Sequence, residues 1–252
     1  MKKQILLALT VCCLIGSKGF AQNKSDDKKL TFGVSIGAAI PLSAYGSKNT
    51  DTTQAAHNDS THRENGYASS GFHFDVTAGY RFTNNIGAMI LIGGNMNSFD
   101  ATTYSTVNDV KSPATYTSTS YYVGQYLIGP FVSFPAGDKL RIDIRVLVGL
   151  MMANTPTGTT TETIGSQTAT GVYSGNGGSG FGYQFGAGIR YNFTDMIGLL
   201  VNVDYAGSTL SYTGYSYKQT SPYFNYTVTN TTLKATMALG LITTAVGVSF
   251  SF

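Results

Sequence analysis

Charged residues are scarce in this chain of 252 residues. Asp, Glu, Lys and Arg make up 12% of it, whereas about 25% is usual for soluble domains. Three of the 16 basic residues, Lys2, Lys3 and Lys18, fall within the first 21 positions, which leaves 13 basic and 13 acidic residues in the rest of the chain. A nucleic-acid-binding surface needs a basic surplus, so we expect no nucleic-acid partner.

Cysteine and long apolar runs are also nearly absent. Both cysteines, Cys12 and Cys13, lie in the opening stretch "MKKQILLALTVCCLIGSKGFAQ", where two lysines, an apolar run and small residues follow one another. This layout is typical of a cleaved secretory signal peptide, which we predict over residues 1–21, with a short polar segment over 22–29. Lipidation at Cys12 or Cys13 is the alternative, but the bulky Val11 before Cys12 disfavours such a site. The exported chain then has no disulfide, and no later apolar run reaches the ~20 residues of a transmembrane helix.

Glycine and aromatic residues are abundant instead, with 30 Gly, 17 Tyr and 14 Phe. Many segments alternate strictly between apolar and polar residues, as in "KLRIDIRVLVGLM" at 139–151, and a period of two is the signature of a strand with one apolar face. The alternation is less clean in "IGAMILIGG" and "YYVGQYLIGPFVSF". The pattern predicts eight strands: 30–42, 72–82, 86–97, 119–134, 139–151, 180–193, 196–207 and 235–252.

The connections between these segments alternate strictly in length. Three are short and rich in turn residues: 83–85, 135–138 and 194–195. Four are long and rich in Thr, Ser, Asn and Gly: 43–69, 98–118, 153–179 and 208–234. Two hairpins also share a pattern, "GYRFTNNIGAM" and "GIRYNFTDMIGLL", which indicates one hairpin design used twice. Tight turns are therefore expected at one end of the molecule and large loops at the other.

The polar face distinguishes a membrane barrel from a soluble sandwich. It carries mainly Gly, Ser, Thr and Asn with sparse charges of both signs, which suits a cramped interior, and aromatic residues flank the turns as lipid-facing barrels require. An even number of strands with alternating short and long connections is the arrangement of bacterial outer-membrane barrels. We therefore predict an all-β fold, an eight-stranded antiparallel up-and-down transmembrane β-barrel, over residues 30–252.

The last residues, "AVGVSFSF", place Phe250 and Phe252 on the apolar face of the final strand. This ending resembles the C-terminal signature of outer-membrane barrels, and the chain resembles the small eight-stranded family of the OmpA, OmpX and opacity-protein type. "GPFVSFP" and "KLRIDIRVLVGL" are similar to Bacteroidetes-type members. The resemblance implies a monomer in the cell outer membrane of a Gram-negative bacterium, with outer-membrane lipid and the barrel-insertion machinery as partners. It also implies that Phe250 and Phe252 form the insertion signal.

The alternation places several charged side chains in the lumen. An eight-stranded barrel is only wide enough to be filled by side chains, and buried charges must be paired, so the preferred interpretation is a packed ionic core. A narrow channel for small solutes, or for small apolar compounds as the resemblance to OmpW-like barrels implies, is the alternative. Gln184 and Asn202 share this face with the predicted lumen charge network: His73, Asp75, Arg81, Arg141, Asp143, Arg145, Arg190 and Asp204.

No catalytic, cofactor-binding or metal site is expected. Some outer-membrane barrels modify lipid, and His57 and His62 with Asp59 and Ser60 in "HNDSTH" are the candidate groups. General-base catalysis needs a histidine held by an orienting partner, and an exposed polar loop explains these residues more simply. We therefore expect no enzyme.

The tyrosine-rich long connections suit surface recognition, because Tyr joins an apolar ring to a polar tip. The simpler interpretation of "SYTGYSYKQTSPYFNYTVTN" is that its strands extend the sheet beyond the membrane. The resulting prediction is a structural or surface-interaction role, adhesin-like, through four long external loops that contact host or surface ligands.

Overall fold

The structure is a computed structural model that describes residues 29–48, 65–108, 110, 112–223 and 225–252. The predicted signal peptide, most of the polar segment after it, and His57, Asp59, Ser60 and His62 lie outside these residues. No helix within the described ranges is long and apolar enough to span a membrane.

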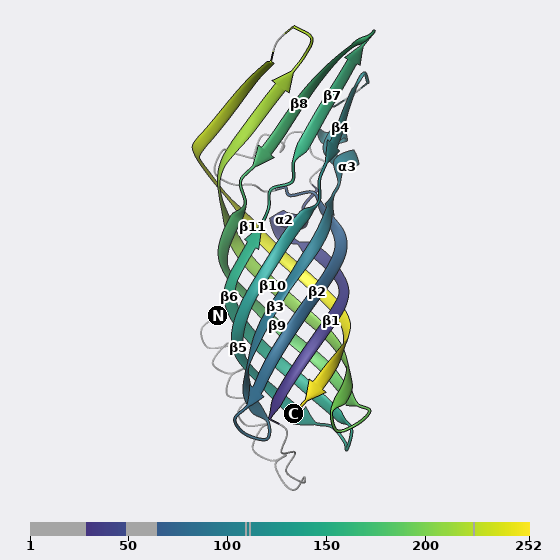
Figure 1. Cartoon of the computed structure of the whole chain (residues 1–252), viewed down its shortest axis with the longest axis vertical. Coiled ribbons are helices and arrows are strands. Elements are labelled where there is room, and N and C mark those ends of the chain that lie inside the picture. Colours follow the sequence, from purple (N-terminus) through teal and green to yellow (C-terminus); the bar gives the residue numbers. More distant parts are fainter. Residues whose placement is uncertain (1–28, 49–64, 109, 111, 224) are drawn as a thin grey trace.

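Eight antiparallel strands close into a ring, which confirms the predicted fold (Figure 1). Their order around the ring is β1-β2-β3-β5-β6-β9-β10-β11, and β11 pairs with both β10 and β1. The strands of the ring are β1 (Leu30–Leu42), β2 (Ala68–Arg81), β3 (Ile86–Phe99), β5 (Tyr121–Pro135), β6 (Leu140–Ala153), β9 (Gly178–Asn192), β10 (Ile197–Thr220) and β11 (Asn225–Ser251).

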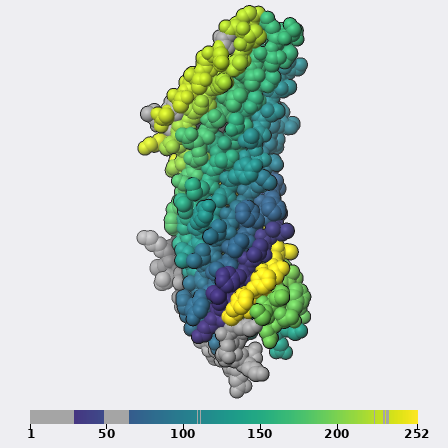
Figure 2. Space-filling model, in the orientation of Figure 1, coloured from purple at the N-terminus to yellow at the C-terminus, as the bar shows by residue number. Residues whose placement is uncertain are grey.

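The two ends of the described chain close the ring. The backbone N–H of Phe252 donates to the carbonyl of Leu30 at 2.8 Å, and the Leu30 N–H donates back at 3.1 Å. Above this pair, β1 and β11 stay in register from Thr31 opposite Ser251 to Leu42 opposite Gly240. Figure 2 shows the result as the yellow C-terminal strand lying against the purple first strand.

The alternation of the sequence gives the barrel its two faces. On β6, Ile142, Ile144 and Val146 are 40%, 48% and 42% exposed, whereas Asp143 and Arg145 between them are 8% and 5% exposed. Because successive side chains of a strand point to opposite faces, this apolar set covers the outside of the barrel and this polar set points into its interior.

Two of the tight turns share one hydrogen-bond pattern, as their repeated sequence predicts. In the β2–β3 turn the Thr83 hydroxyl accepts from the N–H of Asn85 at 3.3 Å and of Ile86 at 3.0 Å. In the β9–β10 turn the Thr194 hydroxyl accepts from the second and third residues after it, at 3.2 and 3.0 Å. We call the end of the barrel with these turns the turn end, and the opposite end the loop end.

The loop end adds further strands to the expected four long loops. Three further strands form there: β4 (Ala114–Ser118), β7 (Gly158–Ile164) and β8 (Gln167–Gly175). They join the upper ends of β10 and β11 in one sheet of order β11-β10-β8-β7-β4, which projects beyond the barrel (Figure 1). We call this the outer sheet.

The outer sheet corrects the predicted bounds of the last two strands. β10 continues for 24 residues and β11 for 27, well beyond 196–207 and 235–252. The physical reason is that alternating Thr and Tyr favour strands, so the sheet extends where a loop is expected from composition. This outcome agrees with the simpler interpretation of the tyrosine-rich segment.

Two short helices complete the loop end. Helix α2 (Ser43–Gly46) follows β1 directly, and α3 (Ala101–Val107) follows β3. The Asp100 side chain caps α3 by accepting from the Thr103 N–H at 3.0 Å. Tyr45 of α2 is fully buried, so this helix closes part of the barrel mouth.

Candidate functional site

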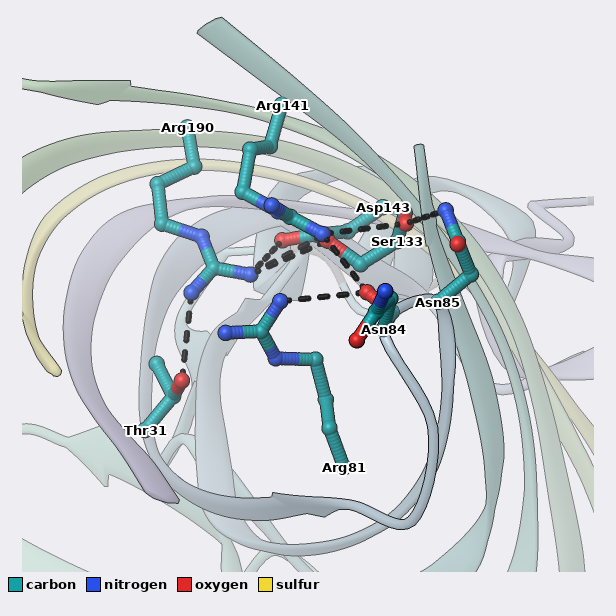
Figure 3. A network of polar contacts seen from close by, with 8 residues as sticks. All are labelled: Thr31, Arg81, Asn84, Asn85, Ser133, Arg141, Asp143 and Arg190. Atoms are coloured by element: carbon teal, nitrogen blue, oxygen red, sulfur yellow. Dashed lines mark hydrogen bonds and ion pairs between the residues drawn. The ribbon is translucent and has the colours of Figure 1, made fainter. Parts of the chain in front are cut away.

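The lumen near the turn end holds a network of arginines around one aspartate (Figure 3). Arg190 on β9 donates from Nη2 to both carboxylate oxygens of Asp143 on β6, at 3.0 and 2.8 Å. Its Nη1 reaches the Thr31 hydroxyl on β1 at 3.2 Å. The guanidinium thus spans three strands, and the ion pair is buried, with side-chain exposures of 4% and 12%.

Arg141 and Arg81 hold the β2–β3 turn from inside the barrel. Arg141 donates from Nε to the Ser133 hydroxyl at 2.9 Å and from Nη2 to the Asn84 carbonyl at 3.0 Å. Arg81 donates from Nη1 to the same carbonyl at 3.2 Å. Figure 3 shows both guanidinium groups converging on this turn, which ties the turn to β5 and β6.

A second ion pair involves Arg145, two residues after Asp143 on β6. Arg145 and Asp204 on β10 pair in a bidentate geometry, with Nε to Oδ1 at 2.7 Å and Nη2 to Oδ2 at 2.5 Å. Their side chains are 5% and 2% exposed. Bidentate arginine–carboxylate pairs add geometric specificity to their energy. Both residues lie opposite Gly186 of β9 in the strand register, so this pair ties β6 to β10 over the inner face of the strand between them.

His73 completes the interior charges on the opposite wall. Its Nε2 lies 2.9 Å from Asp75 Oδ2, and its Nδ1 lies 2.8 Å from Asn95 Oδ1. All eight residues of the predicted lumen network therefore point into the barrel. The structure divides them into three groups: Arg190–Asp143 with Arg141 and Arg81, Arg145–Asp204, and His73–Asp75.

Beyond Arg145 and Asp204, toward the loop end, most inward side chains are apolar, with Asn97 and Gln125 buried among them. On β6 the inward side chains there are those of Leu147 and Met151, both fully buried. Tyr45 packs edge-on against Tyr121 with ring centroids 4.9 Å apart. We call this apolar filling the plug; its members include Leu91, Leu127, Leu147, Met151, Leu210, Met237, Leu239, Leu241, Tyr45 and Tyr121.

The plug is the part of the interior that the alternating pattern does not predict. Its signal is the poor alternation of "IGAMILIGG" and "YYVGQYLIGPFVSF", because Leu91 and Leu127 place apolar side chains on the inner face of strands whose outer face is already apolar. Where both faces are apolar, the period of two disappears.

The space beside the two ion pairs is small. A cavity of about 20 Å³ lies beside Asp143, Arg145 and Arg190. Since one water needs about 10–15 Å³ of such space, this cavity has room for one or two waters. The geometry is that of a packed core, with the ion pairs toward the turn end and the plug, which also surrounds the buried Asn97 and Gln125, toward the loop end.

The two faces of the outer sheet carry different residues. In its register Tyr217 lies opposite Tyr173 and Val228, and the Tyr217 and Tyr226 rings are 6.2 Å apart. The tyrosine face carries Tyr116, Tyr173, Tyr215, Tyr217 and Tyr226. The alternate positions form the threonine face: Thr115, Thr117, Thr159, Thr161, Thr163, Thr168, Thr170, Thr220, Thr227 and Thr229.

Helix α3 joins the outer sheet to the barrel through aromatic contacts. The Tyr104 ring of α3 lies 4.4 Å from Tyr116 and 5.5 Å from Phe99 at the end of β3. Burial raises the pKa of the Tyr116 phenol to about 12, with Tyr104 as a second cause. The phenols of Tyr104 and Tyr116 therefore stay neutral. Together with Phe99, these rings pack where the tyrosine face meets the barrel.

Metal-binding groups do not gather in the described part of the chain. No group of three or more His, Cys, Asp or Glu residues there could hold a metal ion. His73 is 2% exposed and lies inside the lumen. The other two histidines lie outside the described residues.

The chain is similar, at low identity, to solved structures of outer-membrane proteins. The attachment invasion locus protein Ail of Yersinia pestis is 10% identical, with 89% of this chain and 99% of that chain covered and a TM-score of 0.42. Neisserial surface protein A is 12% identical, with coverage of 88% and 97% and a TM-score of 0.45. The outer membrane protease OmpT from Escherichia coli is 9% identical, with coverage of 93% and 100% and a TM-score of 0.47.

No curated protein is significantly similar to the chain in sequence. The model of one family, the outer membrane protein beta-barrel domain, matches residues 6–239. A match over this length, together with the closed ring of eight strands, shows that the chain belongs to the outer membrane protein beta-barrel domain family and is a protein of the outer membrane.

Proposed function

We propose that this protein is a non-enzymatic surface-interaction protein whose barrel anchors the outer sheet at the cell surface, in an adhesin-like role. The observation that carries the proposal is the folding of three long connections into one sheet with a tyrosine face and a threonine face. Tyrosine offers a broad apolar ring with a polar tip and loses little rotamer entropy on binding. Such a surface suits contact with other cells or molecules.

The packed lumen supports the same proposal. The Arg145–Asp204 pair lies on the inner wall over β9, and the plug fills the lumen toward the loop end. A narrow channel for small solutes or small apolar compounds is the competing function. It would require a path through the region of the ion pairs and through the plug. The barrel serves best as a rigid anchor.

The experiment compares cells that display the full chain with cells that display a chain in which a Gly-Ser linker replaces residues 158–175. This change removes β7 and β8 from the middle of the outer sheet. We expect it to reduce adhesion to surfaces coated with collagen, laminin or a bacterial polysaccharide. Heat-modifiable gel mobility should stay that of a closed barrel.

Point variants separate the two faces. Tyr217→Ser with Tyr226→Ser changes the tyrosine face, and Thr220→Ser with Thr227→Ser is the matched control on the threonine face. Adhesion that survives every change contradicts the proposal, as does a wild-type chain that adheres to none of the coatings. Reproducible conductance steps of the purified chain in planar bilayers would favour the channel instead.

A further inference from the structure

The outside of the barrel has a groove near the loop end, formed by β5, β6 and β9. It measures about 470 Å³, within the range of roughly 300–1,000 Å³ that is typical of ligand sites. Its lining includes Tyr122, Gly124, Tyr126, Met152, Asn154 and Ser179.

The groove faces the membrane and does not open into the lumen. Gly124 points outward, because its neighbours Val123 and Gln125 are each 1% exposed and point inward. Behind the groove the strand pairing is continuous, with Gly124 opposite Met152 and Met152 opposite Ser179. A molecule in this groove therefore comes from the membrane side.

An open glycine creates the hollow, and the other outward glycines of the barrel strands are covered. A Cβ on Gly94 would meet the Phe74 ring at 2.8 Å, and one on Gly207 would meet the Tyr183 hydroxyl at 2.6 Å. At Gly240 the Ser43 hydroxyl lies 2.8 Å away. A Cβ on Gly124 would have one atom of the described residues within 4 Å, apart from its chain neighbours: Tyr126 Cε2 at 3.6 Å. The hollow at Gly124 is thus left for another molecule.

The height of the groove matches the edge of the bilayer. Tyr122 lies twelve residues along β5 from Phe134, which is at the turn end. With a rise of about 3.4 Å per residue and a tilt of about 40°, this separation is about 30 Å along the barrel axis. The lipid-facing band of such barrels is about 25 Å tall, so the groove lies where acyl chains meet headgroups.

The chemistry of the groove changes along its length. Met152 and the Tyr126 ring, 47% and 52% exposed, form its apolar part. At the other end Asn154 is fixed to the wall, because its Oδ1 accepts from the Tyr122 N–H at 2.5 Å and its Nδ2 donates to the Ser120 carbonyl at 3.2 Å. All lining residues are uncharged.

We propose that this groove holds one acyl chain of a membrane lipid. The chain lies over Gly124 and Met152, and the lipid's ester or hydroxyl groups lie at the end with Asn154 and Ser179. Because the lining is uncharged, the contact depends on the chain and not on the charge of the headgroup. The inference does not rest on the proposed surface role.

Native mass spectrometry of the full chain released from lipid nanodiscs tests this proposal. The nanodiscs contain phosphatidylethanolamine in one arm and phosphatidylglycerol in the other. We expect the wild type to retain one lipid in both arms. Gly124→Leu fills the hollow without a backbone clash, and we expect it to lose the retained lipid.

Ala187→Leu is the matched control, since it adds a similar side chain to the membrane face of β9 away from the groove, and it should retain the lipid. Tyr126→Ala removes one wall without filling the hollow and should weaken retention. Heat-modifiable mobility verifies that each variant is a closed barrel. A wild type without retained lipid overturns the proposal, as do equal retention by Gly124→Leu and retention in the phosphatidylglycerol arm alone.

Discussion

The two halves of β10 show how one strand serves two environments. From Ile197 to Tyr205 the outward residues are Ile, Leu, Val and Tyr, and the inward ones include Asn202 and Asp204 at 3% exposure. Beyond Gly214, where the pairing register with β11 shifts, the strand reads Tyr, Ser, Tyr, Lys, Gln, Thr. In the barrel the polar side is dry and the apolar side faces lipid, whereas both sides of the outer sheet are polar or amphipathic. The barrel therefore depends on buried pairs and packing, and the outer sheet on strand pairing and ring contacts.

The largest expected effect comes from breaking the barrel's bidentate ion pair. Asp204→Ala leaves the Arg145 guanidinium buried without its carboxylate, and breaking such a pair costs about 3–5 kcal/mol. The free energy of unfolding in lipid vesicles, measured by denaturant titration, should fall by this amount. Arg145→Met combined with Asp204→Leu should recover most of it, because replacing both members of a buried pair is often neutral. A double variant as unstable as Asp204→Ala would contradict this account.

Next in size is the difference between the plug and the lipid face. Leu147→Ala removes a fully buried side chain and should cost about 2–5 kcal/mol. Val148→Ala, one residue along and 41% exposed, should cost less because lipid tails close over the gap. Denaturant titration of both variants measures the difference. Equal costs would mean that the interior beside Leu147 is not packed.

The sequence predicts the ring of strands well because lipid on one side and a narrow interior on the other enforce the period of two. His73, Arg81, Arg141 and Arg190 stand out as inward charges for the same reason. Which of the inward charges pair with each other does not follow from the sequence. Arg145 and Asp204, for example, are 59 positions apart, and only the closure and stagger of the barrel decide which rows of side chains meet.

The plug and the groove are harder to predict. Leu91 and Leu127 look like lipid-facing residues in the sequence, and the structure alone places them inside. Gly124 resembles Gly94 in sequence, and the difference between them is whether a ring from the next strand covers the glycine. Contacts of this kind depend on register and rotamer, which composition does not report.

A smaller, local effect is expected in the outer sheet. The Tyr173 and Tyr215 rings stack with centroids 5.5 Å apart, and such pairs contribute roughly 0.5–1.5 kcal/mol. Tyr173→Ala should therefore speed tryptic cleavage after Lys218 on the paired strand and leave barrel unfolding unchanged. Thr227→Ala on the threonine face is the control. Cleavage that is equally fast in both variants, or a matching loss of barrel stability, would show that the two regions are not separate in the way we describe.

The smallest effect is a pH dependence confined to α3. The N–H of Thr103 and the ammonium group of Lys48, 2.9 Å away, lower the pKa of Asp100 from 3.8 to about 2. A carboxyl group whose pKa is lower in the folded state stabilises the fold above its unfolded value near 4, and this contribution is lost as the pH falls through about 2. Hydrogen-exchange protection factors in Ala101–Val107 should therefore drop between pH 5 and pH 2, while those of the barrel strands stay constant. Asp100→Asn keeps a side-chain cap and should remove the pH dependence. Wild-type protection factors that are the same at pH 5 and pH 2 would show that Asp100 does not hold this helix to the barrel rim.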